Sequence, residues 1–430
     1  MRKTQIFLIL VLTILAGISA QAHDLRVEMD EPSTDSLRRI EGDETAAAIL
    51  KVQERTEKLR GWKLDAPVPA YYLDSNTIQK NLVKMIEEEW PEAERKASEA
   101  FLKSLGAMPE DMEILNMYIA FLDEQAGGLY DQRSKKLFVR EGYDIVGSAF
   151  AQMILAHEIC HAIQDRAFDL EKVGIQAEEN DDRALAALCM AEGDAMLLMQ
   201  EYAAHYASMN LLEDAAENLF MDQSALEATP HFFKMQLIFP YTAGQAFLDE
   251  ARKHMKDGRN HVFREPPVST EQVIHSEKYF GDVDLPSSLT LREPEGTDWN
   301  LPENPAKPEV PAGFKRVTAN ALGEVGMRAL FEDRLGAGIA YDAAEGWDGD
   351  FYVMYQNQDG RWWFAWESAW DSETDAREFL GALVTHWRSV YEAPRLGSLS
   401  KSRQAWQMGK WKVQIERAEN RVMVQWLEVE

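Results

Sequence analysis

The segment His157-Glu158-Ile159-Cys160-His161 carries residue types whose spacing suits metal-dependent hydrolysis. On a helix, positions four apart lie on one face, so the two imidazoles can bind one Zn²⁺ at about 2.0–2.1 Å each. Glu158 can then accept a proton from a water polarised by the metal and pass it to a leaving group. We therefore predict one zinc ion per chain, bound by His157 and His161, with Glu158 as general base.

The surroundings of this segment favour a metal site over the alternative, a pair of hydrogen-bonded core histidines. The segment is central in an apolar helix predicted from Ser148 to about Ala167. Burying two histidines and a glutamate on such a helix is costly unless a metal or polar partners compensate.

A catalytic zinc site needs a third protein ligand and one open position. Glu192 is our candidate, because it lies in a largely apolar helix predicted from Asp181 to about Ala207, with Asn180 as its N-cap. A buried carboxylate needs an opposite charge, which either zinc or an arginine such as Arg183 supplies. The weaker candidates for third ligand are Asp194, Glu178, Glu179 and His205.

Several separate motifs resemble one family. They are HEICHAIQDRAFDL at 157–170, RALAALCMAEGDA at 183–195, FPYTAGQAF at 239–247 and PPVSTEQVIHSEKY at 266–279. They are similar to a family of bacterial and archaeal predicted zinc metallopeptidases, in which an HExxHALQDQ helix is followed by EGDA, FPY-x-xG and STEQ-x-xHP-x-KY motifs. The resemblance spans roughly residues 45–390. Its HExxH-plus-Glu arrangement, which is gluzincin-like, implies the ligands His157, His161 and Glu192 and the base Glu158.

The matching motifs also supply candidates for supporting roles. Peptide hydrolysis needs a donor for the developing oxyanion, and His275 and Tyr241 are our candidates; each is alternatively a structural residue. Gluzincins usually carry an acid four residues after the third ligand, where this chain has Met196, and the nearby acid is Asp194. Asp165, one turn past His161, is the other candidate for orienting that histidine.

Two cysteines, Cys160 and Cys189, lie on the two predicted metal helices. If those helices pack antiparallel, a disulfide can join them; two buried free thiols are the alternative. Cys160 is not expected to bind the metal, because its side chain is rotated about 100° from that of His161.

The composition describes an acidic globular protein. The chain has 430 residues, 46% hydrophobic and 27% charged, and a formal charge of -28 from 45 basic and 73 acidic residues. A strongly acidic surface repels nucleic acid and anionic membranes but says nothing about the reaction. The expected partner, a peptide or protein substrate, follows from the predicted peptidase chemistry.

The first 22 residues resemble an export signal. Arg2 and Lys3 precede an apolar run from Ile6 to Ile18, and Ala20-Gln21-Ala22 offers a cleavage site. The run is shorter than the ~20 residues that span a bilayer, and no later stretch is long and apolar enough. We expect a protein exported to the periplasm or the extracellular space, without an integral membrane segment once the signal is removed.

The predicted fold class is α+β, in two domains. A flexible stretch at 23–43 precedes a mostly helical metallopeptidase domain at 44–284 with a small β-hairpin. Further helices are predicted at 45–59, 76–86, 92–105 and from 108 to about 125, and the hairpin at 129–139. The outer edge of that hairpin either pairs with an extended peptide or is a plain sheet edge.

A Pro-rich linker at 285–314 separates this domain from a smaller α+β domain at 315–430. Helices are predicted there at 322–335 and 374–390, and strands at 351–355, 362–366, 411–415 and 422–426. Its dense aromatic residues, including Trp362, Trp363, Trp366 and Trp370, favour a core of large side chains over a ligand groove.

Three readings of function remain besides the zinc peptidase. One is a non-catalytic, zinc-stabilised binding module, which would have no need for Glu158 beside an open coordination position. Another is an amidase acting on the cell envelope. The third is a latent enzyme whose cleft is covered by the acidic N-terminal stretch or by the C-terminal domain.

Overall fold

The computed structural model describes residues 38–73, 83, 86, 90–125, 128–174, 180–206, 224–289, 310–391 and 403–429. The predicted signal peptide, most of the stretch at 23–43, most of the helix predicted at 76–86 and most of the Pro-rich linker lie outside these residues. Among the helices that are described, none has the length and apolar character needed to cross a bilayer.

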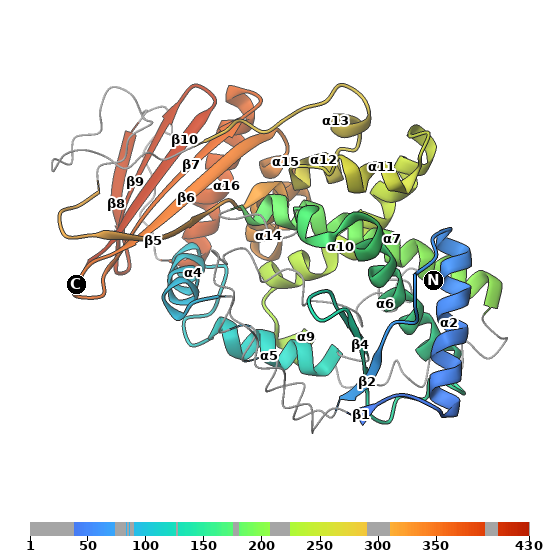
Figure 1. The fold of residues 1–430 in the computed structure, drawn as a ribbon. Coiled ribbons are helices and arrows are strands. Elements are labelled where there is room, and N and C mark those ends of the chain that lie inside the picture. Colours follow the sequence, from blue (N-terminus) through green and yellow to red (C-terminus); the bar gives the residue numbers. More distant parts are fainter. Residues whose placement is uncertain are drawn as a thin grey trace.

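The first part of the chain is mainly helical and surrounds a small sheet (Figure 1). Its helices are α2 (Glu44–Arg60), α4 (Glu92–Leu105), α5 (Ile114–Gln125), α6 (Ala149–Phe168), the short 3-10 helix η1 (Leu170–Lys172), α7 (Asp181–Tyr206), α9 (Ser224–Ala228), α10 (His231–His254), α11 (Arg259–Arg264), α12 (Thr270–Ile274) and α13 (Glu277–Phe280). Its strands are β1 (Arg38–Arg39), β2 (Ala70–Leu73), β3 (Gly128–Asp131) and β4 (Lys136–Arg140), in the order β1-β2-β4-β3.

Most of the predicted helices in this part are confirmed, because local signals define their ends. Asn180 accepts a hydrogen bond from Arg183 N at 2.9 Å at the start of α7, as a capping residue should. The predicted hairpin is β3–β4, but β4 also pairs in parallel with β2, which the sequence did not predict. Helix α5 begins at Ile114, later than expected, because the segment with Pro109 forms a turn.

The C-terminal part contains a second, larger sheet with helices on one face (Figure 1). The elements are β5 (Lys315–Asn320), α14 (Gly323–Leu335), α15 (Ala337–Ala344), β6 (Trp347–Gln356), β7 (Trp362–Trp370), α16 (Glu373–Val390), β8 (Arg403–Met408), β9 (Trp411–Ala418) and β10 (Arg421–Glu428). All neighbouring strands are antiparallel, in the order β5-β6-β7-β10-β9-β8. The α+β class is therefore confirmed for the described chain.

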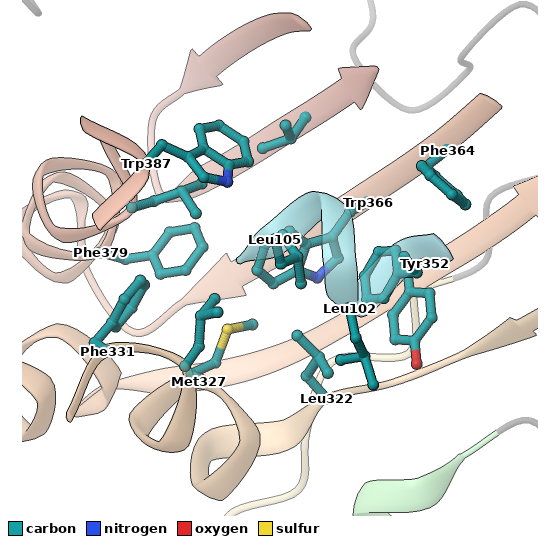
Figure 2. Packing of buried hydrophobic residues seen from close by; sticks show 14 of the residues in the cluster. Leu102, Leu105, Leu322, Met327, Phe331, Tyr352, Phe364, Trp366, Phe379 and Trp387 are labelled. Carbon is teal, nitrogen blue, oxygen red and sulfur yellow. The ribbon is translucent and has the colours of Figure 1, made fainter. Parts of the chain in front are cut away.

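Helix α4 packs on the sheet of the C-terminal part, although the sequence predicted it within the first domain. The ring of Phe101 stacks on Tyr352 with centroids 4.0 Å apart and lies 5.5 Å from Trp426. Figure 2 shows Leu102 and Leu105 of the same helix among Trp366, Tyr352 and their neighbours. The two predicted domains thus share one hydrophobic core. Local periodicity showed that α4 has an apolar face but not that this face packs on the C-terminal sheet.

Many aromatic residues of the C-terminal part belong to this core, whereas Trp363 lies in a separate, smaller cluster. Trp363, Trp366 and Trp370 are almost completely buried, as the sequence analysis favoured. The segment Gly346–Asp350 also has a structural role, because the Asp350 carboxylate accepts the backbone N–H groups of Leu322 and Gly323 and the indole N–H groups of Trp347 and Trp366. These bonds hold the N-terminus of α14 against the sheet.

The motif Ser269–Gln272 joins the two parts. Thr270 on α12 donates its hydroxyl to Asp182 at the start of α7 and accepts Val325 N of α14 at 3.2 Å. Close by, Lys278 lies 2.5 Å from Glu271, 3.0 Å from Asp284 and 3.1 Å from Asp371. These three carboxylates have the spacing of a metal site, and the Lys278 ammonium lies within 3.1 Å of all three.

Helices α7 and α10 approach each other closely through two glycines. A Cβ atom at Gly193 would lie 2.3 Å from the backbone carbon of Gly244, and one at Gly244 would lie 2.2 Å from Cys189 O. Only glycine permits such a contact. Since Gly193 lies between Glu192 and Asp194, the contact sets the position of the segment that faces the predicted metal site.

Candidate metal centre

His157 and His161 lie one turn apart on α6, both inside the molecule. His157 is fully buried and His161 is 6% exposed. Their ring centroids are 4.7 Å apart with the planes at 82°, and their Nε2 atoms are 3.0 Å apart. Both rings therefore present the same nitrogen to one small volume, as two ligands of a single ion would.

Glu192 on α7 completes this group. Its Oε2 lies 3.1 Å from His157 Nε2 and 3.5 Å from His161 Nε2. One ligand atom from each of the three residues lies within 4.8 Å of the others. Arg183, the alternative partner for this carboxylate, is nine residues earlier on the same helix, about 13 Å along its axis. The structure thus brings together the three residues predicted as ligands.

The charges of these three groups are strongly interdependent. Burial acts to raise the pKa of Glu192, but His161 outweighs that effect and holds the pKa well below its usual value. Burial acts to lower the pKa of His161, yet the Glu192 carboxylate raises it to about 9. Burial lowers the pKa of His157. The pair therefore consists of a cationic imidazole, His161, beside an ionised carboxylate, Glu192.

The neighbouring Glu158 is fully buried below strand β3. Its Oε2 accepts the backbone N–H of Tyr130 at 2.8 Å, while Oε1 has no hydrogen-bond partner among the described residues. Burial raises the pKa of this carboxyl to about 7. A Cβ atom at Gly128 would lie 3.9 Å from Glu158 Cγ, so the strand passes directly over this side chain. The geometry leaves one carboxylate oxygen available to a small polar molecule.

Gln164 contacts the histidine that lies one turn before it. Its Oε1 is 2.9 Å from His161 Nδ1, and its Nε2 donates to Ala191 O at 2.9 Å and to Asp194 Oδ2 at 3.0 Å. Asp194 is completely buried and pairs with Arg60 of α2 at 2.8 Å and Arg259 of α11 at 3.1 Å. Asp194 thus reaches the centre through Gln164 and not by touching a ligand.

The assignment of Asp165 as the group that orients His161 is wrong. Its Oδ2 accepts Tyr130 Oη at 2.8 Å and Lys135 Nζ at 2.6 Å, both from the β3–β4 hairpin. Both donors contact Oδ2, whereas Oδ1 is buried without a hydrogen-bond partner among the described residues. Gln164 occupies the position next to His161 Nδ1. Asp165 therefore ties the hairpin to α6.

The two candidate oxyanion donors lie in different places. Tyr241 on α10 is buried with its ring centroid 6.4 Å from that of His157, beside the metal centre. His275 instead places Nε2 at 2.9 Å from Glu324 Oε1 of α14, at the contact between the two parts of the chain. Motif spacing could not reveal this acidic partner, and the role of His275 as an oxyanion donor stays a prediction.

The remaining candidates have structural roles or fall outside the described residues. Cys160 and Cys189 are both buried and free, so the disulfide is not formed. The ring of His205 donates to Glu201 O at 2.8 Å near the end of α7. The other two candidate ligands, Glu178 and Glu179, belong to the part of the chain that is not described.

Sequence reasoning missed three residues of this centre. Gln164 carried a signal, because it lies three residues after His161 and so shares its helix face. Arg60 and Arg259 carried none, since they come from helices far away in sequence. Only the packing of α2 and α11 against α7 brings their guanidinium groups to Asp194.

Comparison with known proteins adds little about this centre. A family model described as a domain of unknown function, DUF8575, matches residues 310–427, which is the C-terminal part of the chain. No curated protein matches the chain, and no solved structure matches it either. The three residues of the candidate metal centre lie outside the matched residues.

Proposed function

We propose that this chain is an exported zinc-dependent metallohydrolase, and specifically a peptidase. The observation that carries the proposal is the convergence of His157, His161 and Glu192, with one ligand atom of each within 4.8 Å of the others. The resemblance to gluzincin-like metallopeptidases supports the same ligand set. The export signal predicted at residues 1–22 supports a periplasmic or extracellular location.

The donor set fits zinc. Two imidazole nitrogens and one carboxylate oxygen are ligands that catalytic zinc sites use, and three protein ligands leave a fourth position open. The buried Glu192 carboxylate supplies a negative charge that a zinc ion bound there would neutralise. Bound there, zinc would supply Lewis acidity toward a carbonyl group and a water.

The contacts of Glu158 support a role for it as the general base at this centre. Its Oε1 has no hydrogen-bond partner among the described residues, so this oxygen can accept a proton from a water beside the ligands. Tyr130 N holds Oε2 at 2.8 Å and thereby aims the carboxylate. Tyr241, whose ring lies beside His157, is the candidate donor to the developing oxyanion.

The neighbouring sheet supports a peptide substrate. β3 is the outer strand of the described four-stranded sheet, and its Tyr130 N–H points toward Glu158. An extended peptide that pairs with such an edge would have its backbone held close to the general base. An amide of the cell envelope is the alternative substrate class.

The test combines metal analysis with a single substitution. The purified mature protein is analysed for zinc, and Glu158→Gln is compared with wild type on a mixed peptide library. We expect one zinc per chain in both proteins and a loss of about 10²–10⁴-fold in cleavage for the variant. Glu378→Gln, an exposed position on α16, is the matched control and should cleave normally.

The other outcomes identify the competing functions. Bound zinc with no cleavage that depends on Glu158 would favour a zinc-stabilised binding module. Cleavage of peptidoglycan fragments but of no peptide in the library would favour the envelope amidase. Absence of zinc, together with unchanged cleavage after chelation, would contradict the proposal.

A further inference from the structure

The hydrogen bonds of Gln164 determine which way its side-chain amide points. One end of the amide faces two acceptors, Ala191 O at 2.9 Å and Asp194 Oδ2 at 3.0 Å. If the amide were rotated by 180°, its oxygen would lie against both of these oxygens. The Nε2 atom must therefore face the two acceptors, and Oε1 must face His161.

The orientation of the amide fixes the role of one nitrogen of His161. Because Gln164 Oε1 can only accept, the Nδ1 atom of His161, 2.9 Å away, has to donate a proton. When the ring loses its other proton, as a metal ligand must, the lone pair is therefore on Nε2. That nitrogen is the one that faces Glu192 at 3.5 Å and His157 at 3.0 Å.

Asp194 is in turn held from two sides. Arg60 of α2 and Arg259 of α11 contact it at 2.8 and 3.1 Å, and its side chain is fully buried. Two guanidinium groups from two different helices therefore face this one carboxylate. Its negative charge draws the Gln164 amide N–H groups toward it.

We propose that Gln164 is a positioning residue, which, anchored by Asp194, holds His161 in the form whose Nε2 binds the metal. The inference rests on the proposed metal centre and adds how that centre is oriented. Gln164 does not touch the metal or the substrate. It acts on metal affinity through one hydrogen bond to a ligand, and removing such a bond typically weakens metal binding by 10–100-fold.

The test measures zinc affinity by competition with a chromophoric chelator. Gln164→Met keeps the approximate side-chain volume but removes both the acceptor and the donors. Gln152→Met is the matched control, because Gln152 also lies on α6 and donates to Ile145 O at 3.0 Å, away from the ligands. Chemical denaturation of the metal-free proteins records how far each substitution affects folding alone.

We expect a 10–100-fold weaker zinc affinity for Gln164→Met and a change of less than threefold for Gln152→Met. Equal affinity of Gln164→Met and wild type would overturn the inference. If wild type itself binds no zinc, it is the proposed function that fails. A zinc-binding wild type with an unaffected variant contradicts only the role of Gln164.

A second measurement needs no variant and so does not depend on folding of the substituted protein. Nitrogen-15 NMR of the zinc-loaded wild type reports which ring nitrogen of His161 carries the proton. We expect a protonated Nδ1 with slow proton exchange, because it is buried and bonded to Gln164. A deprotonated Nδ1 would overturn the proposal.

Discussion

Gly193→Ala tests the idea that the contact between α7 and α10 positions the metal centre. A Cβ atom at this residue would lie 2.3 Å from the backbone carbon and 2.4 Å from the carbonyl oxygen of Gly244. Non-bonded carbon atoms prefer about 3.5 Å or more, so the two helices would have to separate by about 1.2 Å. Both close contacts are with backbone atoms, which cannot rotate away.

The expected cost follows from two opposing effects. Alanine is a better helix former than glycine by about 1 kcal/mol, which favours the variant. Overpacking of a well-packed contact costs about 1–3 kcal/mol and occasionally more, and contact with a backbone belongs at the upper end. We therefore expect a net loss of about 2 kcal/mol in the free energy of unfolding.

The same displacement should reach the metal ligands. Glu192 precedes Gly193 directly, and metal–ligand distances tolerate only about 0.2 Å of error. Moving this part of α7 by about 1 Å relative to α6 should weaken zinc binding by at least about tenfold. The assays are chemical denaturation without metal and zinc competition with a chelator.

Gly381→Ala on α16 provides the matched control. Its added Cβ would meet no atom within 4 Å, so only the gain in helix propensity remains. This variant should be stabilised by up to about 1 kcal/mol, with unchanged zinc affinity. If Gly193→Ala behaves like this control in both assays, the reasoning about the α7–α10 contact is refuted.

Two further predictions concern stability. Burial raises the pKa of the Asp182 carboxyl from 3.8 in the unfolded chain to about 7. The contribution of this carboxyl to the free energy of unfolding is therefore fully present below pH 3.8 and is lost as the pH rises through 7. Asp182→Asn keeps the acceptor for Thr270 but cannot ionise. Between pH 4 and pH 8, the free energy of unfolding of this variant should therefore fall by up to about 4 kcal/mol less than that of wild type, as measured by chemical denaturation. An equal fall in both proteins would contradict this prediction. Phe101→Ala removes a ring stacked on Tyr352, and denaturation should record a loss of about 3–5 kcal/mol. A loss below about 1 kcal/mol would argue against the packing of α4 on the C-terminal sheet.

Local sequence patterns were sufficient to predict many of the helices and strands. The helices predicted at 92–105 and 148–167 are α4 and α6, because apolar spacing and end signals lie within the element itself. Helix α10 was not predicted, although its segment supplied one of the family motifs. Pro240 stands inside it, and a proline usually ends a helix.

Partners between elements were harder to predict than the elements themselves. β4 appeared as half of a hairpin, yet it also pairs with β2, more than sixty residues earlier. The domain boundary drawn at the Pro-rich linker assigned α4 to the first domain, although its apolar face covers the second sheet. An amphipathic pattern shows that a face is buried but not which surface buries it.

The candidate site divides in the same way. The sequence alone determined the relation between His157 and His161, because helix geometry places residues four apart on one face in any fold. It also singled out Glu192, since an ionised group in an apolar helix demands a partner.

Only the tertiary structure decided what surrounds those three residues. Gln164 rather than Asp165 contacts His161, Arg60 and Arg259 reach Asp194, and His275 pairs with an acid of α14. These contacts depend on distances between helices that are remote in sequence. Such distances follow from packing, as at the two glycines that join α7 to α10, and no local periodicity records them.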